Sequence, residues 1–300
     1  MLRLSKSVQA ARAAGRPLVA LESTIIAHGL PWPQNLDVAQ ELEAIVRSEG
    51  AEPATIALHQ GQICIGLEPE ALATLAHPET EVAKVSRRDM ALILTQGGWG
   101  ATTVAATLVC AAKAHIRVFA TGGIGGVHRG AEQDFDISAD IPELAQQPVA
   151  VVCAGAKSIL DLPKTLEALE TAGVPLVGYQ THTFPSFFTR SSGLPLEHCV
   201  DTPQDIAAIL KTQDELGLCQ SLLICNPVPE QAALSKDDET QWINQALSEA
   251  RAQGIRGKAA TPFLLKRLVE LSDGKTLAAN LALVKSNVRL AAQIQVRKNQ

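Results

Sequence analysis

Short apolar runs alternate along the chain with stretches of helical periodicity. Residues 17–21 form an apolar run that predicts a buried strand, whereas residues 34–49 repeat apolar side chains every three or four positions and end at Gly50, as an amphipathic helix does. This alternation predicts an α/β fold, a single α/β/α domain over residues 1–300 with a mostly parallel central sheet flanked by helices. Strands are expected at 17–21, 54–58, 62–66, 81–85, 116–120, 149–154, 175–179 and 221–225, and helices at 34–49, 69–76, 101–114, 164–171, 203–216, 237–253, 259–271 and 275–294.

Composition narrows the class of protein. The chain has 300 residues, of which 46% are hydrophobic, so it can bury a large core. The net charge of −5 and the lack of a basic run argue against a nucleic-acid polymer as partner. Six cysteines without a C-x-x-C pair favour buried, reduced thiols. The first fifteen residues favour a short amphipathic helix, and no apolar run is long enough for a signal peptide or a membrane span. We therefore expect a soluble, cytoplasmic protein.

Polar and ionisable side chains follow several of the expected strands. Glu22 comes directly after 17–21, Lys84 lies near the end of 81–85, and Lys157 follows 149–154. Ligands of parallel α/β sheets bind beyond the carboxyl ends of the strands. We therefore expect these side chains to share one site.

Lys157 and Glu22 each allow two interpretations. A lysine after an apolar strand would be partly desolvated, which favours the neutral amine that attacks carbonyls and forms Schiff bases. The alternative is an exposed loop lysine paired with Asp161. Burial would raise the pKa of Glu22 and suit it to proton donation. The alternative is a capping or salt-bridged carboxylate.

Two glycine-rich segments could approach an anion. Residues 122–126 fail the G-x-G-x-x-G spacing, and no helical pattern follows them, so a dinucleotide site is not predicted. A flexible loop whose backbone amides approach a phosphate fits better. Residues 97–100 precede the expected helix at 101–114, where a helix start could bind an anion or form an ordinary turn.

Three aspartates, Asp134, Asp136 and Asp140, occur within one short segment. In an extended conformation their carboxylates would share one side and could bind a hard divalent cation. The segment lacks the glycine and glutamate of an EF-hand loop, and a solvated acidic loop is the alternative.

Longer motifs resemble a known family, the pseudouridine-5′-phosphate glycosidases, also called indigoidine synthase A-like. The resemblance covers roughly residues 15–295, and its motifs keep the family's order. It departs from the family's pattern at Trp99 and Ser286. The motifs are ALESTIIAHGLP at 20–31, VAKVSRRD at 82–89, GATTVAAT at 100–107, TGGIGGVHRGA at 121–131, DISAD at 136–140 and AGAKSILD at 154–161.

The resemblance implies a function and a set of residues. It implies cleavage of the carbon–carbon glycosidic bond of pseudouridine 5′-phosphate to uracil and ribose 5-phosphate, by a homotrimer. Lys157 would form a Schiff base with the ring-opened ribose, and Glu22 would transfer a proton. Asp136 would hold one Mn²⁺ per subunit together with waters, and no organic cofactor is implied. Substrate contacts are implied for Lys84, Val104, Thr121, His128, Ser138, Ala139, Asp140 and Asn280.

Two other functions remain open at this point. A Schiff-base aldolase acting on a sugar phosphate would use the same lysine and phosphate site but no uracil pocket. A nucleotide-binding regulator or scaffold on this fold would keep its ligand affinity after loss of Lys157.

Overall fold

The strands form one continuous, mostly parallel sheet. The structure, a computed structural model, describes residues 1–255, 257 and 260–299. Over those residues the strand order is β1-β4-β3-β2-β7-β8-β11-β9-β10, and β5 and β6 join through β6 to β3. Only the pairs β3–β4 and β3–β6 are antiparallel. The strands are β1 (Leu2–Leu4), β2 (Leu18–Leu21), β3 (Glu52–His59), β4 (Gln62–Ile65), β5 (Val82–Val85), β6 (Trp99–Thr102), β7 (Val118–Ala120), β8 (Ala150–Cys153), β9 (Leu176–Tyr179), β10 (Cys199–Val200) and β11 (Leu223–Cys225).

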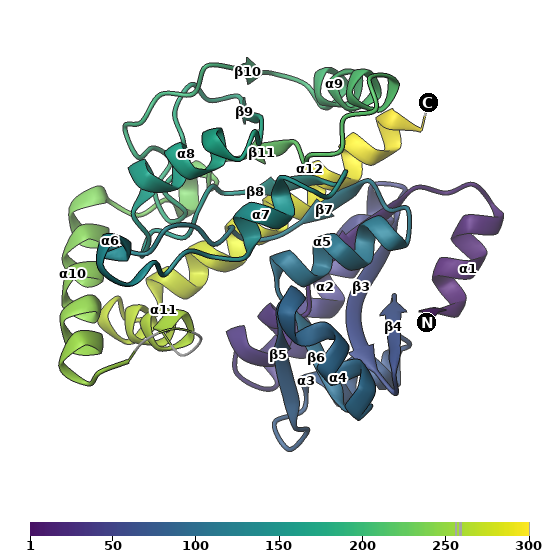
Figure 1. The fold of residues 1–300 in the computed structure, drawn as a ribbon, viewed down its shortest axis with the longest axis horizontal. Helices are drawn as coiled ribbons and strands as arrows, with labels where there is room; N and C mark the ends of the chain where they lie inside the picture. The colour runs from purple at the N-terminus through teal and green to yellow at the C-terminus, as the bar shows by residue number, and fades with distance from the viewer. Residues whose placement is uncertain (256, 258–259, 300) are drawn as a thin grey trace.

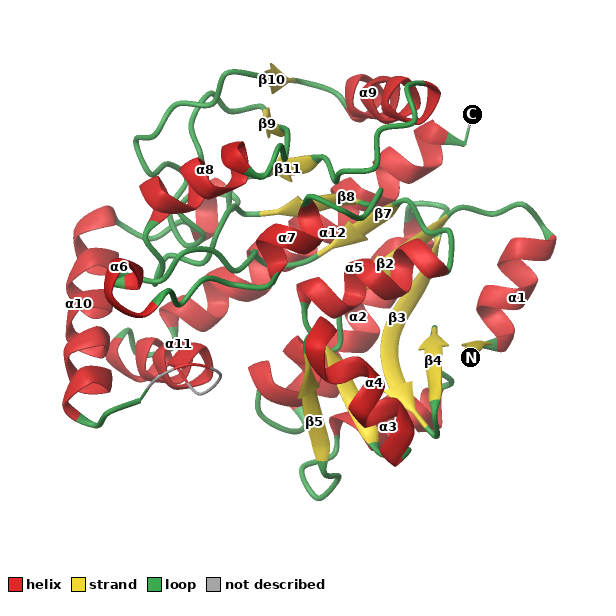
Figure 2. Cartoon of the chain, in the orientation of Figure 1, coloured by secondary structure: helices red, strands yellow, loops and turns green. Residues whose placement is uncertain are grey.

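Helices cover both faces of this sheet (Figures 1 and 2). The 24-residue helix α12 packs on β2, β7 and β8 and also contacts α2 and α9, whereas α5 and α7 pack together on the opposite side. The predicted α/β/α architecture is confirmed. The helices are α1 (Lys6–Ala13), α2 (Gln34–Ser48), α3 (Pro69–Ala76), α4 (Met90–Gln96), α5 (Val104–Lys113), α6 (Ala131–Asp134), α7 (Asp140–Leu144), α8 (Leu162–Thr171), α9 (Pro203–Glu215), α10 (Lys236–Ala252), α11 (Ala260–Leu271) and α12 (Lys275–Lys298).

Local sequence explains where several helices start. Asp161 caps α8 by accepting a hydrogen bond from the amide of Lys164, and Pro163 stands in the first turn, where it costs no hydrogen bond. Thr202 and Asp205 form a reciprocal capping box at the start of α9. The expected helix at 259–271 begins at residue 259, which lies outside the described residues, and α11 is described from Ala260.

The expected helix at 101–114 is wrong in its first turn. Trp99–Thr102 is strand β6, parallel to β5 and antiparallel to β3, and the helix begins only at Val104. Gly97, with φ 78°, ends the preceding helix α4, which the sequence pattern did not predict. The glycine-rich segment at 97–100 therefore does not open a helix. The prediction that this segment forms an anion-binding helix start is wrong. Strands β1 and β10, short edge strands, were also not predicted.

The cysteines are only partly as expected. All six are free thiols, and Cys64, Cys110, Cys153 and Cys225 are buried, but Cys219 is exposed and Cys199 is half-buried. Burial raises the pKa of the Cys110 and Cys153 thiols to about 12, so neither is a reactive thiolate. No helix in the described part of the chain is long and apolar enough to cross a bilayer.

Candidate active site

The ends of the adjacent strands β2 and β7 carry the first two residues of the site. The register pairs Leu21 with Ala120, so Glu22 and Thr121 are neighbours at the carboxyl edge of the sheet. The hydroxyl of Thr121 donates a hydrogen bond to Glu22 Oε1, and its amide donates to the carbonyl of Val152 on β8 at 3.0 Å. The expected convergence of these strand ends is confirmed.

Glu22 is a half-buried acid with charges of both signs nearby. Burial raises the pKa of its carboxyl above the ordinary value, and Asp140 adds to this. The positive charge of Lys157, the hydrogen bond from Thr121 and the charge of Lys84 act in the opposite direction and are outweighed together. The expected rise in pKa is confirmed. The alternative of a capping or salt-bridged carboxylate is wrong, because among the described residues Glu22 caps no helix and has no ion pair within 4 Å.

Lys157 is half-buried and points back to the glycine loop. Its Nζ donates to the carbonyl of Gly123 at 2.7 Å, and its amide donates to the carbonyl of Ile124 at 3.1 Å. Asp161, the partner proposed for an exposed loop lysine, instead caps α8 and pairs with Lys164 at 3.2 Å. The loop-lysine alternative is therefore wrong, and the amine lies within electrostatic reach of Glu22.

Lys84 reaches the same site from the antiparallel arm of the sheet. It stands on β5 in register with Ala101 of β6, and β6 is joined to the main sheet through β3. Its charge helps to lower the pKa of both Glu22 and His28, although burial is the larger cause for His28. His28 follows Glu22 on a short π-helical segment, Ile25–Gly29, and sequence reasoning missed it.

Asp140 ties three segments of the site together. Its Oδ1 accepts from the amide of Ala105 in the first turn of α5 at 2.9 Å, and its Oδ2 accepts from the amide of Gly125 at 2.7 Å. With 6% of its surface exposed, the carboxylate has both oxygens committed to backbone amides. It therefore fixes the starts of α5 and α7 beside the glycine loop.

The glycine loop is tightly packed rather than flexible. Its amides at Ile124, Gly125 and Val127 bind the carbonyl of Gly155, the carboxylate of Asp140 and the hydroxyl of Thr165. A Cβ at Gly125 would lie 2.2 Å from Ser138 Oγ, and one at Gly123 would lie 2.6 Å from the ring of Phe187. The expected flexibility of the loop is wrong, and the amides of Ile124 and Gly125 cannot bind a phosphate because the protein itself occupies them.

The remaining predicted contacts border this cluster. Val104 is the first residue of α5, so its amide has no acceptor within the helix. Ser138 and Ala139 precede α7, and Ser138 Oγ accepts from the amide of Asp140 at 3.2 Å. Asn280, on α12, places its side-chain oxygen beside Gly122.

Asp136 and His128 form a separate pair. His128 Nδ1 lies 4.0 Å from Asp136 Oδ2, and the His128 amide donates to the Asp136 carbonyl at 3.0 Å. The three aspartates do not share one side, because Asp134 ends α6 and Asp140 is buried elsewhere. No group of three or more His, Cys, Asp or Glu side chains in the described residues is arranged to hold a metal. A partly exposed carboxylate with one imidazole nearby fits a cation that keeps most of its waters.

Two buried amides support the site from behind, and sequence reasoning missed one of them, Asn287. Asn287 on α12 is fully buried, and its Nδ2 donates to the carbonyls of Thr121 at 2.8 Å and Gly122 at 3.3 Å. Asn226, after β11, donates to Asn287 Oδ1 at 2.9 Å and to Ser286 Oγ at 3.0 Å. A polar residue on the apolar stripe of the long helix was the signal that could have revealed Asn287.

The fold and the site define an α/β enzyme in which a lysine and a half-buried glutamate lie within electrostatic reach of each other at the carboxyl edge of a mostly parallel sheet. The chain belongs to the family described as indigoidine synthase A like protein, whose model matches residues 7–297.

Named relatives and solved structures resemble the whole chain. A pseudouridine-5′-phosphate glycosidase of Paracoccus denitrificans (strain Pd 1222) is 57% identical over 98% of this chain and 97% of its own length. One of Staphylococcus aureus (strain MW2) is 54% identical over 99% and 97%. The prealnumycin C-glycosynthase AlnA in complex with ribulose 5-phosphate superposes with a TM-score of 0.91 at 36% identity, covering 100% of this chain and 97% of that one. An indigoidine synthase A-like protein of Thermotoga maritima MSB8 gives a TM-score of 0.88 at 36% identity, covering 95% and 94%.

Proposed function

We propose that the protein is a pseudouridine-5′-phosphate glycosidase, which cleaves the carbon–carbon glycosidic bond to give uracil and ribose 5-phosphate. The observation that carries this function is the half-buried amine of Lys157 within reach of Glu22, whose pKa is raised by burial. Relatives that share more than half of their residues with this chain over nearly its full length carry this name. A C-glycosidic bond resists simple hydrolysis, and a nucleophilic amine with a nearby acid supplies another route.

Lys157 acts as the nucleophile in this mechanism. Its neutral amine bonds to C1′ of the ribose as the C1′–O4′ bond opens, and the proton that the nitrogen loses is taken up by O4′ to give the open-chain hydroxyl. The C1′–C5 bond then breaks, its electron pair goes to C5 of the uracil, and the nitrogen lone pair forms an imine with C1′. Water hydrolyses the imine and releases ribose 5-phosphate and the free amine.

Glu22 supplies the proton that C5 of the uracil must gain as the bond breaks. Its raised pKa favours the protonated acid, and Thr121 orients the carboxyl. General-acid help is typically worth about 10²–10⁴ in rate. Glu22→Gln should lose turnover on that scale while staying folded and still forming the Lys157 adduct. Near-normal turnover of this variant would refute the role.

The phosphate binds where two helices start. The amide of Val104 begins α5, and Ser138 and Ala139 precede α7, so this corner favours an anion. Lys84 adds positive charge and His128 a hydrogen-bonding imidazole, while Thr121 and Asn280 line the sugar and base. Asp140 acts by holding the amides in place, since both its oxygens already accept from backbone amides.

One Mn²⁺ per subunit is proposed at Asp136, with His128 close by and waters completing the coordination. Bound there, the ion would supply Lewis-acid stabilisation of negative charge on the substrate. Metal content measured after gel filtration should fall in Asp136→Ala, and chelation should abolish turnover until Mn²⁺ is restored. Full turnover after exhaustive chelation would exclude this proposal.

The function is tested by incubating the protein with pseudouridine 5′-phosphate and Mn²⁺ and detecting free uracil. Borohydride added with ribose 5-phosphate should attach the reduced sugar to the peptide that contains Lys157, and Lys157→Arg is the control. A label on Lys84 alone would refute the nucleophile. Retro-aldol products without uracil would instead favour a Schiff-base aldolase acting on a sugar phosphate, and unchanged ligand affinity in an inactive protein would favour a regulator.

A homotrimer is proposed as the assembled form, and the cytoplasm as its location. Phe135 and Ile137, which flank Asp136, are 81% and 47% exposed, an apolar surface that assembly would cover. Sedimentation equilibrium should give three times the mass of 31.8 kDa. A monomer at micromolar concentration would contradict the assembly.

A further inference from the structure

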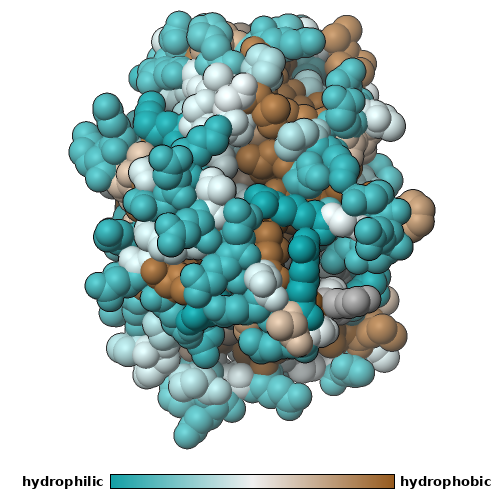
Figure 3. All heavy atoms as spheres, turned by 90° about the vertical axis from the view of Figure 1, so that its left-hand side faces the viewer, coloured by the Kyte–Doolittle hydropathy of each residue, from teal (hydrophilic) through white to brown (hydrophobic). Residues whose placement is uncertain are grey.

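A second cavity lies on the far side of the lysine-bearing loop. It has a volume of about 420 Å³ and lies between the segment that follows Lys157 and helix α10. That volume is within the range of small-metabolite sites. Figure 3 shows the face that carries α10, where apolar atoms are visible between hydrophilic side chains. The lining residues come from three segments, at 158–163, 186–194 and 236–243, together with Arg129.

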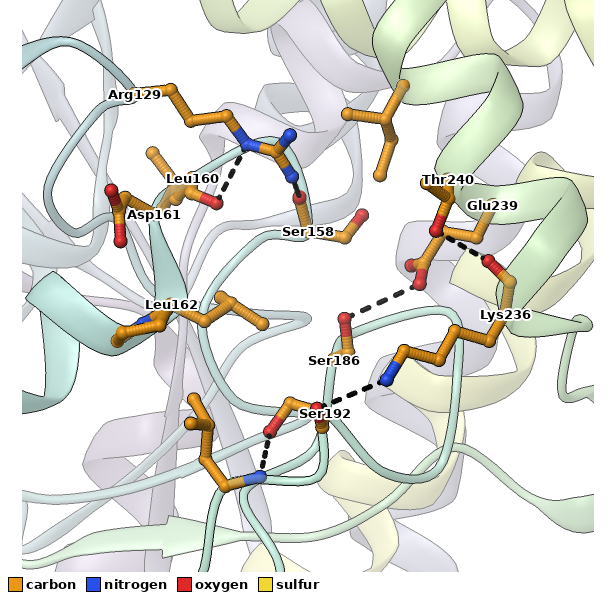
Figure 4. A pocket seen from close by; sticks show the side chains of 13 residues that line it. Arg129, Ser158, Leu160, Asp161, Leu162, Ser186, Ser192, Lys236, Glu239 and Thr240 are labelled. Carbon is orange, nitrogen blue, oxygen red and sulfur yellow. Dashed lines mark hydrogen bonds between the residues drawn. The ribbon is translucent and has the colours of Figure 1, made fainter.

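The floor of this cavity holds buried polar atoms without partners. Glu239 and Ser158 are 5% and 3% exposed, and neither Glu239 Oε1 nor Ser158 Oγ has a hydrogen-bond partner among the described residues. Ser186 approaches the other oxygen of Glu239 at 3.4 Å, a weak contact. Figure 4 shows these three side chains converging on the same space. Buried polar groups are normally paired, so a carboxyl oxygen and a hydroxyl that both lack a partner point to a ligand.

The rim of the cavity carries positive charge. Arg129 donates to the carbonyls of Leu160 and Ser158 at 3.4 Å each, and Lys236 donates to the carbonyl of Ser192 at 3.5 Å. Over the part of the chain that the structure describes, neither cation has a carboxylate within 4 Å. Asp161, the other acid of the lining, is neutralised by Lys164 at 3.2 Å.

We propose that this cavity is a second binding site, for a small hydroxylated anion of the sugar-phosphate or sugar-acid class. The anionic group binds Arg129 and Lys236 at the rim, and hydroxyl groups bind Glu239, Ser158 and Ser186 at the floor. A hydroxyl both donates and accepts, so it satisfies the carboxyl of Glu239 and the serine hydroxyl together. Leu160 and Ile243 provide the apolar wall for the carbon chain.

This site stands back to back with the lysine centre. Lys157 turns its amine to Gly123, and the next residue, Ser158, lines the cavity. His128 pairs with Asp136, and the next residue, Arg129, forms the rim. The two sites therefore share walls without sharing side chains.

Calorimetric titration tests the proposal on the full chain with three probes: ribose 5-phosphate, gluconate and inorganic phosphate. Lys236→Met removes a rim charge from the exposed start of α10, Lys84→Met alters the lysine centre only, and Lys211→Met on the exposed side of α9 is the matched control. At least one hydroxylated probe should bind the native chain. Its affinity should fall about tenfold in Lys236→Met and should be unchanged at this site in Lys84→Met and Lys211→Met.

The titration separates the two sources of the anion and can overturn the proposal. Binding of gluconate alone assigns a sugar acid, and binding of ribose 5-phosphate alone assigns a sugar phosphate. Equal affinities in the native chain and Lys236→Met overturn the site, as does failure of every probe to bind at millimolar concentration. If inorganic phosphate binds as tightly as the hydroxylated probes, Glu239, Ser158 and Ser186 do not bind hydroxyl groups of the ligand, and that part of the proposal is overturned. If the protein releases no uracil but still binds a probe in a way that depends on Lys236, the proposed function is refuted and the second site stands.

Discussion

Glu239 should make the stability of the protein depend on pH, in a direction that its surroundings fix. The side chain stands on the first turn of α10 at the floor of the second cavity, 5% exposed. Burial raises the pKa of its carboxyl to about 7, although the nearby hydroxyls of Ser158, Thr189 and Ser186 act to lower it. Replacing Glu239 with Gln keeps the shape and removes the ionisation.

The size of the effect follows from the difference between the folded and unfolded pKa values. The unfolded chain loses the proton near the ordinary pKa of 4.5, whereas the folded chain keeps it until the pH reaches about 7. The stabilisation is therefore fully present below pH 4.5 and is lost as the pH rises to and through 7. At about 1.4 kcal/mol per pH unit, the loss amounts to about 3 kcal/mol. For a chain of 300 residues this corresponds to a fall in Tm of about 5 °C.

Chemical denaturation of the native chain and Glu239→Gln from pH 4.5 to 8.5 measures this loss. The free energy of unfolding of the native chain should fall by about 3 kcal/mol relative to the variant, because all other titrating groups are shared. Glu215→Gln, at the exposed end of α9, is the matched control and should run parallel to the native chain. A constant difference between the native chain and Glu239→Gln across this range would refute the reasoning.

Three further predictions concern the active site. Thr121→Val removes the hydrogen bond that stabilises the ionised form of Glu22, so the pKa of Glu22 should rise and the alkaline limb of the kcat profile should move to higher pH; an unmoved limb would contradict the pairing. Gly125→Ala places a Cβ 2.2 Å from Ser138 Oγ and should lower turnover by about 10²-fold, whereas Gly98→Ala, which meets no atom within 4 Å, should not; equal turnover in both would show that the loop tolerates displacement. Asn287→Leu leaves two buried carbonyls without their donor and should lower the free energy of unfolding by about 2–4 kcal/mol in urea, against about 1 kcal/mol for Ser286→Ala; similar losses in the two variants would argue against the network.

The sequence predicted the main strands and the residues at their ends because both depend on local patterns. An apolar run followed by an ionisable residue is visible in the chain itself, and this pattern located Glu22 and Lys157 correctly. Strand β6 could not be predicted in this way, since residues 99–102 become a strand through pairing with β3 and β5, which are distant in sequence.

The second cavity was also invisible in the sequence. Glu239 follows two aspartates at the polar start of α10, where an exposed residue is the normal expectation. It is buried because the segment with Ser186 and Thr189 folds against it, a contact between residues about 50 positions apart. The contacts of Asp140 with the amides of Ala105 and Gly125 also join segments that are distant in sequence, so the sequence could not reveal that Asp140 holds the glycine loop. The sequence pattern therefore predicts which residues belong to the site more readily than it predicts the long-range contacts that hold them in place.

Helix α12 makes the site depend on a segment that is synthesised after its nucleophile and its acid. A ribosome makes the chain from its N-terminus, so Glu22 and Lys157 leave the exit tunnel long before Asn280 and Asn287 do. Until α12 docks, the carbonyls of Thr121 and Gly122 lack the amide that holds them at the end of β7. A nascent chain can thus hold its nucleophile and its acid and still lack the rigid spacing that the chemistry requires. The same dependence leaves chains that are truncated before α12 without a fixed centre.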